Sequence, residues 1–509
     1  MFFPREWRWE MLFCKLFCVF HRNLYEPENT PAPPVTPWIY RGFSFSFVEK
    51  AVDNVENSPL SHKAKVVLFY AIMSTVNYIL FLIKNWGQTF GKKCVILYVH
   101  VLFLIYFSRQ EGIPLKYWRG YIVAAALALL SYGLTQFAAA HSNLVDMVYP
   151  YATRLVQDFL AEWSASAAFC LWQVLAIVLV VVFLASIAAL VIFRWNIIQW
   201  LGWVLTGVSL LWCVHTGMYG LNQYASPLAD DIRLNMVVVG DSITPLINAT
   251  TYFRDKANEL SSQVSRDESG NISAEPFAQV VEKAENGFDH LVFDKNYSVF
   301  AGVTTPVKEL GWADMYSSMG IAGITIPFTG EAAVNPQTPI VALPFVACHE
   351  MAHRMCIAQE RDANFAAFLA TTANDDLLYQ YSGYFMAFRY CYNSLASIST
   401  STATNAANQL FAGLNDQVKR DLTAYHDHYK NVQNQDAMDF ATSVNDTYLQ
   451  ASGDEDGVKS YGQVTDLLLS WYWQDIYLPA HAEDEEEDSF DPFDEEYVFD
   501  AGLVATEGK

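Results

Sequence analysis

The sequence predicts an α-helical membrane bundle followed by a soluble α+β domain that is mostly helical and has a small sheet. Three observations support this prediction. Residues 1–217 contain long apolar runs and carry 16 Lys and Arg against 11 Asp and Glu. Residues 218–509 mix helix-like and strand-like patterns and carry 15 Lys and Arg against 43 Asp and Glu. An HExxH motif, His349–His353, lies in this acidic half.

These patterns divide the chain into four segments. They are an N-terminal segment with a proline-rich linker (1–65), a transmembrane region of four or five helices (66–217), a soluble domain (218–480) and an acidic tail (481–509). The tail has 11 acidic and no basic residues between Glu483 and Asp500, which predicts a solvated and disordered chain. The negative charge of the second half argues against nucleic acid as a partner, because phosphate would be repelled.

Five apolar runs are candidates for crossing a lipid bilayer. They are residues 66–84, 94–108, 120–140, 170–193 and 197–217. A hydrocarbon layer of about 30 Å requires roughly 20 apolar residues in a helix. The run "LWQVLAIVLVVVFLASIAALVIF" meets this requirement without a charge, whereas 94–108 is short enough to be a buried core helix instead.

The distribution of Lys and Arg predicts the orientation, because short cytoplasmic loops are enriched in these residues. Arg109, Lys116 and Arg119 place their loop inside, and the acidic loop 141–166 then lies outside. The soluble domain is therefore expected on the outer face of a multi-pass membrane protein. Lys84, Lys92 and Lys93 conflict with this arrangement, since it places them outside.

The motif "HEMAH" predicts a zinc site. On a helix, His349 and His353 are four residues apart and lie on one face, so both imidazoles can reach one ion. Glu350 lies beside them, where it can take a proton from a zinc-bound water and pass it to a leaving group. Although the motif also occurs by chance, this arrangement predicts Zn²⁺ as cofactor and peptide-bond hydrolysis as the reaction.

Zinc requires a third protein ligand, for which Asp362 and Glu360 are the candidates. On one straight helix Asp362 would lie about 20 Å from His349 along the axis, too far to share an ion. The chain must therefore reverse within "RMCIAQE", and a second helix, "DANFAAFLA", must pack back against the first. Asp362 can face the metal in this arrangement, or cap the second helix, or do both.

The sequence gives weaker evidence for the residues that bind substrate. Residues Gly323, Ile324, Thr325 and Ile326 alternate like a strand before the motif, and an edge strand there would pair with an extended peptide. An ordinary core strand explains the pattern equally well. Tyr384 and Tyr461 are candidates to donate a hydroxyl hydrogen bond to the oxyanion, or they are packed tyrosines. No oligomeric state is predicted.

Four longer stretches carry a resemblance to a known family. They are "YGLNQYASPLA" (219–229), "SSMGIAGITIPFTGEAAVN" (317–335), "YSGYFMAFRYCYN" (381–393) and "VNDTYLQASGDEDGVKSYGQVTDLLL" (444–469). Together with the motif they resemble the domain of unknown function 3810 family of bacterial membrane proteins, in which an acidic E-x-E-A-N-F-like segment follows HExxH. The resemblance covers about residues 170–475. It implies a zincin-like metallopeptidase domain anchored to the bacterial cytoplasmic membrane, with Asp362 as the third ligand.

The chain departs from the family pattern at two places. Cys356 stands where the family typically has Gly, and Arg361 and Asp362 replace an acidic pair. These departures motivate an alternative function, a zinc-binding pseudoenzyme that acts as a cell-surface interaction protein. An intramembrane protease is disfavoured because polar residues follow the motif directly. A serine esterase suggested by "MVVVGDSITPL" (236–246) is disfavoured because the later histidines have no aspartate at the required spacing.

Overall fold

The computed structural model describes residues 114–237, 243–302, 305–452 and 464–481, all within one compact unit, Ser74–Lys509. These residues are mostly helical and contain one three-stranded sheet, which confirms the prediction of a mostly helical protein with a small sheet. The expected spans 66–84 and 94–108, the proline-rich linker, Tyr461 and nearly all of the acidic tail lie outside the described residues.

Three of the described helices are long and apolar enough to cross a membrane. They are α5 (Arg119–Ala140), α7 (Leu171–Ile192) and α8 (Ile197–Met218), and they agree with the runs 120–140, 170–193 and 197–217. Helices α5 and α8 approach closely at Gly120, where a Cβ would collide with the backbone of Gly202. Small residues are common at such close contacts between membrane helices. Asn196 begins α8 by accepting hydrogen bonds from two backbone N–H groups of its first turn.

Helix α6 (Ser142–Ala165) connects α5 to α7 and differs from both in composition. It carries four charged side chains and packs against elements of the second half of the chain, including α14 (Leu343–Arg354) and β3 (Glu331–Val334). The predicted division at residue 218 is therefore crossed by direct packing.

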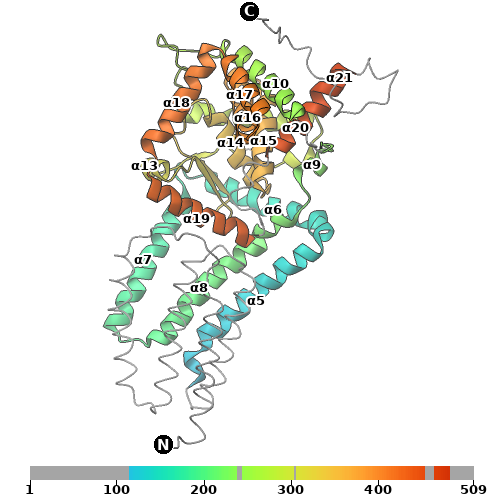
Figure 1. Cartoon of the computed structure of the whole chain (residues 1–509). Coiled ribbons are helices and arrows are strands. Elements are labelled where there is room, and N and C mark those ends of the chain that lie inside the picture. Colours follow the sequence, from blue (N-terminus) through green and yellow to red (C-terminus); the bar gives the residue numbers. More distant parts are fainter. Residues whose placement is uncertain (1–113, 238–242, 303–304, 453–463, 482–509) are drawn as a thin grey trace, which may run out of the picture. The chain divides into compact units, whose positions relative to one another are not determined.

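The remaining α-helices follow α8 along the chain (Figure 1). The α-helices are α9 (Leu228–Asp231), α10 (Thr244–Ser261), α11 (Phe277–Glu282), α12 (Ala284–Phe293), α13 (Ala313–Ser318), α14 (Leu343–Arg354), α15 (Glu360–Ala373), α16 (Leu377–Ser397), α17 (Ser401–Ala412), α18 (Asp416–Val432), α19 (Gln435–Ser452), α20 (Val464–Trp471) and α21 (Leu478–Ala480). Short 3₁₀ turns lie at η1 (Leu115–Tyr117), η2 (Gly220–Tyr224) and η3 (Ser298–Phe300), and a π-helical turn at η5 (Tyr472–Tyr477).

The main hydrophobic core, within residues 228–469, forms around α15. This helix buries apolar residues on nearly all sides, as expected for a helix in the centre of a domain. It packs against α12, α14, α16 and α20. Phe368 of α15 meets Phe253 of α10 and Trp471 of α20 edge to face, a favourable geometry for aromatic rings. This packing fixes α15 beside the motif helix α14.

Two of the three strands lie at the edges of the sheet. Its order is β1 (Lys308–Glu309), β3 (Glu331–Val334), β2 (Gly323–Ile326). Strand β3 is buried and lies parallel to β1 and antiparallel to β2, with Ile324 opposite Ala333. Strand β2 is only partly buried, and among the described strands it pairs with β3 alone. Both β2 and β3 pack against α14.

Candidate metal site

The two histidines of the motif lie side by side on α14. Pro344 occupies the first turn of this helix, where its missing N–H costs no hydrogen bond. His349 and His353, one turn apart, bring their Nε2 atoms to within 3.1 Å of each other, and their rings are nearly perpendicular. Both side chains are largely buried. The predicted pairing of the two imidazoles on one helix face is present in the structure.

The chain reverses immediately after the second histidine, as the sequence predicts. Cys356 adopts a left-handed backbone conformation with φ of 69°. Its N–H donates to the carbonyl of His353 at 3.0 Å, and the N–H of Ile357 donates to the carbonyl of Ala352 at 3.1 Å. These two bonds form a Schellman motif, the usual way in which glycine ends a helix. Cysteine performs the same function here, in spite of its Cβ.

The reversal delivers Glu360 to the histidines. Helix α15 begins at this residue, and its carboxylate Oε2 lies 3.4 Å from Nε2 of His349 and 3.5 Å from Nε2 of His353. Ligand atoms around a tetrahedral zinc ion, at bond lengths near 2.1 Å, are about 3.4 Å apart. The three side chains form the one group of metal-ligating residues that the described part of the chain brings together.

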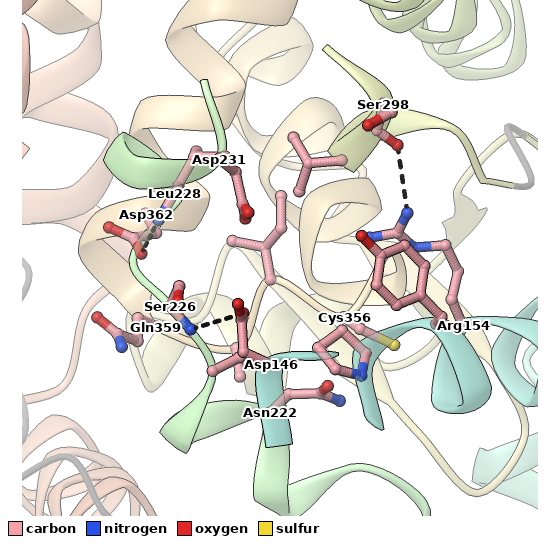
Figure 2. A pocket seen from close by; sticks show the side chains of 16 residues that line it. Asp146, Arg154, Asn222, Ser226, Leu228, Asp231, Ser298, Cys356, Gln359 and Asp362 are labelled. Atoms are coloured by element: carbon pink, nitrogen blue, oxygen red, sulfur yellow. Dashed lines mark hydrogen bonds between the residues drawn. The ribbon is translucent and has the colours of Figure 1, made fainter. Parts of the chain in front are cut away.

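The structure brings Glu360, the alternative candidate, beside the two histidines, and places Asp362, the preferred candidate, elsewhere. The sequence interpretation began the second helix at Asp362, whereas α15 begins two residues earlier. Two residues correspond to a rotation of about 200° around a helix, so the side chains of Glu360 and Asp362 leave on opposite sides. Asp362 Oδ2 accepts a hydrogen bond from the N–H of Leu228 at 2.9 Å, at the start of α9 (Figure 2). Asp362 therefore supports α9.

Asp362 also lines a polar cavity of about 90 Å³ that is formed with α6 and the segment after α8 (Figure 2). Asp146, Arg154 and Asp231 contribute charged side chains to it, whereas neither motif histidine lines it. Burial, followed by the charge of Asp146, raises the pKa of Asp231 to about 6. The cavity and the histidine pair are thus different places in the fold.

The hydrogen bonds around the histidines suit a metal ion. Nδ1 of His353 lies 2.8 Å from the carbonyl oxygen of Ile357, and since a carbonyl only accepts, Nδ1 must carry the proton. In neutral His353, Nε2 then presents a lone pair to His349 and Glu360. Oε2 of Glu360 is buried and has no hydrogen-bond donor among the described residues. A cation between these atoms would satisfy all three, which is the fit expected of a zinc site.

The electrostatics also favour positive charge at this position. Burial alone lowers the pKa of His353, but Glu360 and then Glu350 raise it to about 9. Burial alone raises the pKa of Glu360, but the two histidines bring it well below its usual range. The buried carboxylates thus favour positive charge at this position, and a metal cation would also provide that charge.

Glu350 is held by strand β2. Thr325 donates its hydroxyl hydrogen to Glu350 Oε2 at 2.7 Å, and the same hydroxyl lies 2.9 Å from the backbone carbonyl of Glu350. Gly323 leaves the space that the carboxylate fills, because a Cβ there would collide with Glu350 Oε1. Burial raises the pKa of Glu350, and the histidines and Thr325 partly offset this rise. A raised pKa suits a general base that works near neutral pH.

The candidate tyrosines have different positions. Tyr384 packs against Tyr252, Phe253 and Phe368, so the structure places it in the aromatic core and not beside the histidines. Tyr461 lies outside the described residues. The packing of Tyr384 therefore argues against it as the oxyanion donor, and the role of Tyr461 stays a prediction.

Three residues near the site were not predicted from the sequence. Tyr390 of α16 donates to Asn364 Oδ1 at 3.1 Å, and its pKa is raised by burial and, less strongly, by the charge of Glu360. Tyr219, at the end of α8, donates to the carbonyl of His353 at 3.0 Å. The helical spacing of Glu360 and Asn364, four residues apart, is the one local signal that could have indicated a shared face.

Comparisons with known proteins identify the family. The family model described as "Protein of unknown function (DUF3810)" matches residues 145–469, which is 325 of the 509 residues. The match begins in α6 and ends in α20, so it includes the motif helix, Glu360 and strand β2. No curated protein and no solved structure matches the chain. The chain therefore belongs to the DUF3810 family, as its sequence motifs predicted.

Proposed function

We propose that the protein is a membrane-anchored, zinc-dependent metallopeptidase with a zincin-like domain on the outer face of the bacterial cytoplasmic membrane. The observation that carries this proposal is the convergence of His349, His353 and Glu360 at spacings of 3.1 to 3.5 Å. Two imidazoles and one carboxylate, with one position left open, form the ligand set of hydrolytic zinc sites.

Zinc bound by these three residues would supply Lewis-acid activation of water and of the substrate carbonyl. Glu350 acts as the general base. It takes a proton from the attacking water and returns it to the amine leaving group as the peptide bond breaks. Thr325 and Gly323 hold the carboxylate in a single position, which limits the reorganisation needed during reaction.

The position of β2 at an edge of the sheet argues for a peptide as the substrate. Its outer edge has backbone groups without a partner strand among the described residues. An extended peptide can add to such an edge through main-chain hydrogen bonds. Because Gly323 and Thr325 of this strand also contact Glu350, a peptide aligned along β2 would lie beside the general base.

Two departures from the family pattern motivate the pseudoenzyme alternative, and neither argues strongly for it in this fold. Glu360, not Asp362, lies with the histidines, so the substituted acidic pair does not shorten the reach of the ligand. Cys356 adopts the left-handed conformation that the turn requires. The intramembrane alternative finds no support in the membrane candidates, because α14 is absent from the three apolar helices of the described chain.

The experiment that tests the function uses the full chain purified in detergent. Metal analysis by mass spectrometry should find about one zinc per chain, and a peptide library should be cleaved by the wild type. Glu350→Gln should retain the zinc and lower the cleavage rate by about 10²- to 10⁴-fold, the usual contribution of a general base.

Two results would contradict the proposal. A wild-type protein that binds zinc and cleaves no member of the library supports the pseudoenzyme. A Glu350→Gln variant with unchanged activity shows that the hydrolysis comes from another residue or from a contaminant.

A further inference from the structure

Helix α6 has its apolar side chains on the outward face and its polar side chains toward the rest of the fold, the reverse of a surface helix in a soluble domain. Its outward face carries large apolar side chains that are more than 40% exposed: Leu144, Met147, Val148, Tyr151, Leu155, Val156, Phe159 and Trp163. These residues recur every three or four positions, so they form one stripe along the helix. Leu155 is 72% exposed and Phe159 67%, which is unusual for such side chains when they face water.

The inward face of α6 is polar and is bonded to the metal-site domain. Arg154 donates to the backbone carbonyls of Met355, Ser298 and Ala301 at 3.3 to 3.4 Å. Gln157 donates to the carbonyl of Pro327 at 3.2 Å. All these acceptors are main-chain carbonyl oxygens in turns, and the polar side chains of α6 supply the hydrogen-bond donors that these carbonyls need.

Two of these bonds reach the elements that form the metal site. Met355 is the residue that ends α14 after His353, and Pro327 directly follows β2. The turn from β2 to β3 also touches the backbone of α6, since a Cβ on Gly330 would collide with Gln157 and Ala161. Helix α6 thus contacts the end of the motif helix α14 and the turn that follows the candidate peptide-binding strand β2.

The neighbours of α6 in the chain indicate what covers its outward face. Helix α5 ends at Ala140 and α7 begins at Leu171, and both are candidate membrane spans. Because α6 joins their ends, both of its own ends lie at the membrane boundary. Asp146, Arg154, Asp158 and Glu162 make it unsuited to cross the bilayer. Tyr151 and Trp163 on its outward face are residues typical of the lipid–water interface.

We propose that α6 is an in-plane membrane helix whose apolar face, centred on Leu155 and Phe159, is buried in the interfacial layer of the lipid bilayer. A helix with a polar and an apolar face binds at this depth. The helix then holds the metal site against the membrane surface through Arg154 and Gln157. This inference concerns the position of the domain and does not require that the site hydrolyse peptides.

Spin labelling of the full chain in phosphatidylcholine vesicles tests the proposal. Leu155→Cys and Phe159→Cys are prepared separately, in a background whose label-reactive cysteines are replaced by serine, and each carries a nitroxide. Collision rates with molecular oxygen, which concentrates in lipid, and with a water-soluble nickel chelate are then measured. For a face in lipid, oxygen broadens or saturates the signal strongly and the nickel chelate has little effect.

Two control positions calibrate the measurement. Val181→Cys on the exposed apolar surface of α7 should give the lipid response, and Ala424→Cys on the exposed surface of α18 the aqueous response. If Leu155 and Phe159 respond like Ala424, the face is in water and the proposal is wrong. If both reagents have little access, the face is covered by protein, either another part of this chain or a second copy, and the proposal is equally wrong. The two labelled positions are independent, so a variant that fails to fold leaves the other as a test.

Discussion

Nδ1 of His353 lies 2.8 Å from the carbonyl oxygen of Ile357, and the turn that creates this contact also brings Glu360 to the opposite ring nitrogen. The left-handed conformation of Cys356 bends the chain back after α14. One side of the reversed chain then supplies a carbonyl that orients the imidazole, and the next residues supply the carboxylate. A single turn therefore orients one proposed zinc ligand and provides another.

The first prediction distinguishes the two candidate acids. Glu360→Gln should reduce the zinc content from about one per chain to nearly none after dialysis against a weak chelator, because a charged ligand is replaced by a neutral amide. Asp362→Asn is the matched control, and it should retain zinc because its carboxylate contacts Leu228. Mass-spectrometric metal analysis of the two full-length variants decides. Loss of zinc only in Asp362→Asn would restore the original assignment.

The second prediction concerns the pH dependence of the proposed hydrolysis. The hydrogen bond from Thr325 lowers the pKa of Glu350, because it stabilises the charged carboxylate. Thr325→Val removes this donor, so the pKa of Glu350 should rise. A general base works only when deprotonated, and the acidic limb of the kcat/KM profile should therefore move to higher pH. Thr325→Ser keeps the hydroxyl and should keep the wild-type profile; equal shifts in both variants would exclude the hydrogen bond as the cause.

The third prediction concerns space beside the general base. Gly323→Ala places a methyl group where Glu350 Oε1 lies, so the carboxylate must move. Displacement of a catalytic group by about 1 Å can cost about 10²-fold in rate, while the three proposed zinc ligands are untouched. Peptide cleavage should fall and zinc content should stay constant. Gly133→Ala is the control, because nothing lies within 4 Å of its added Cβ; similar losses in both variants would indicate a general folding defect.

The fourth prediction concerns the turn after the motif. At Cys356 a left-handed backbone is unfavourable for any residue with a Cβ, by about 1–2 kcal/mol relative to glycine. Cys356→Gly and Cys356→Ala both remove the buried thiol and its contact with Thr153. The glycine variant should therefore be more stable than the alanine variant by about 1 kcal/mol. Thermal unfolding of the two variants measures the difference, and equal midpoints would argue against the left-handed conformation.

The sequence by itself determined the features that depend on near neighbours in the chain. The four-residue spacing of His349 and His353 sets both imidazoles on one helix face, and the length of a helix required a reversal before residue 362. The apolar runs at 120–140, 170–193 and 197–217 were also predictable, since a helix of about twenty apolar residues matches the thickness of a bilayer. The family was recognised from stretches of sequence alone.

Only the tertiary structure decided which side chains meet across the fold. The third member of the metal group depends on the residue at which α15 begins, because a shift of two positions turns a side chain to the opposite side of a helix. Thr325 and Gly323 reach Glu350 from a strand some 25 residues earlier in the chain. The outward face of α6 is set by the inward hydrogen bonds of Arg154 and Gln157. Local periodicity follows from the covalent chain, whereas these contacts depend on how whole elements pack.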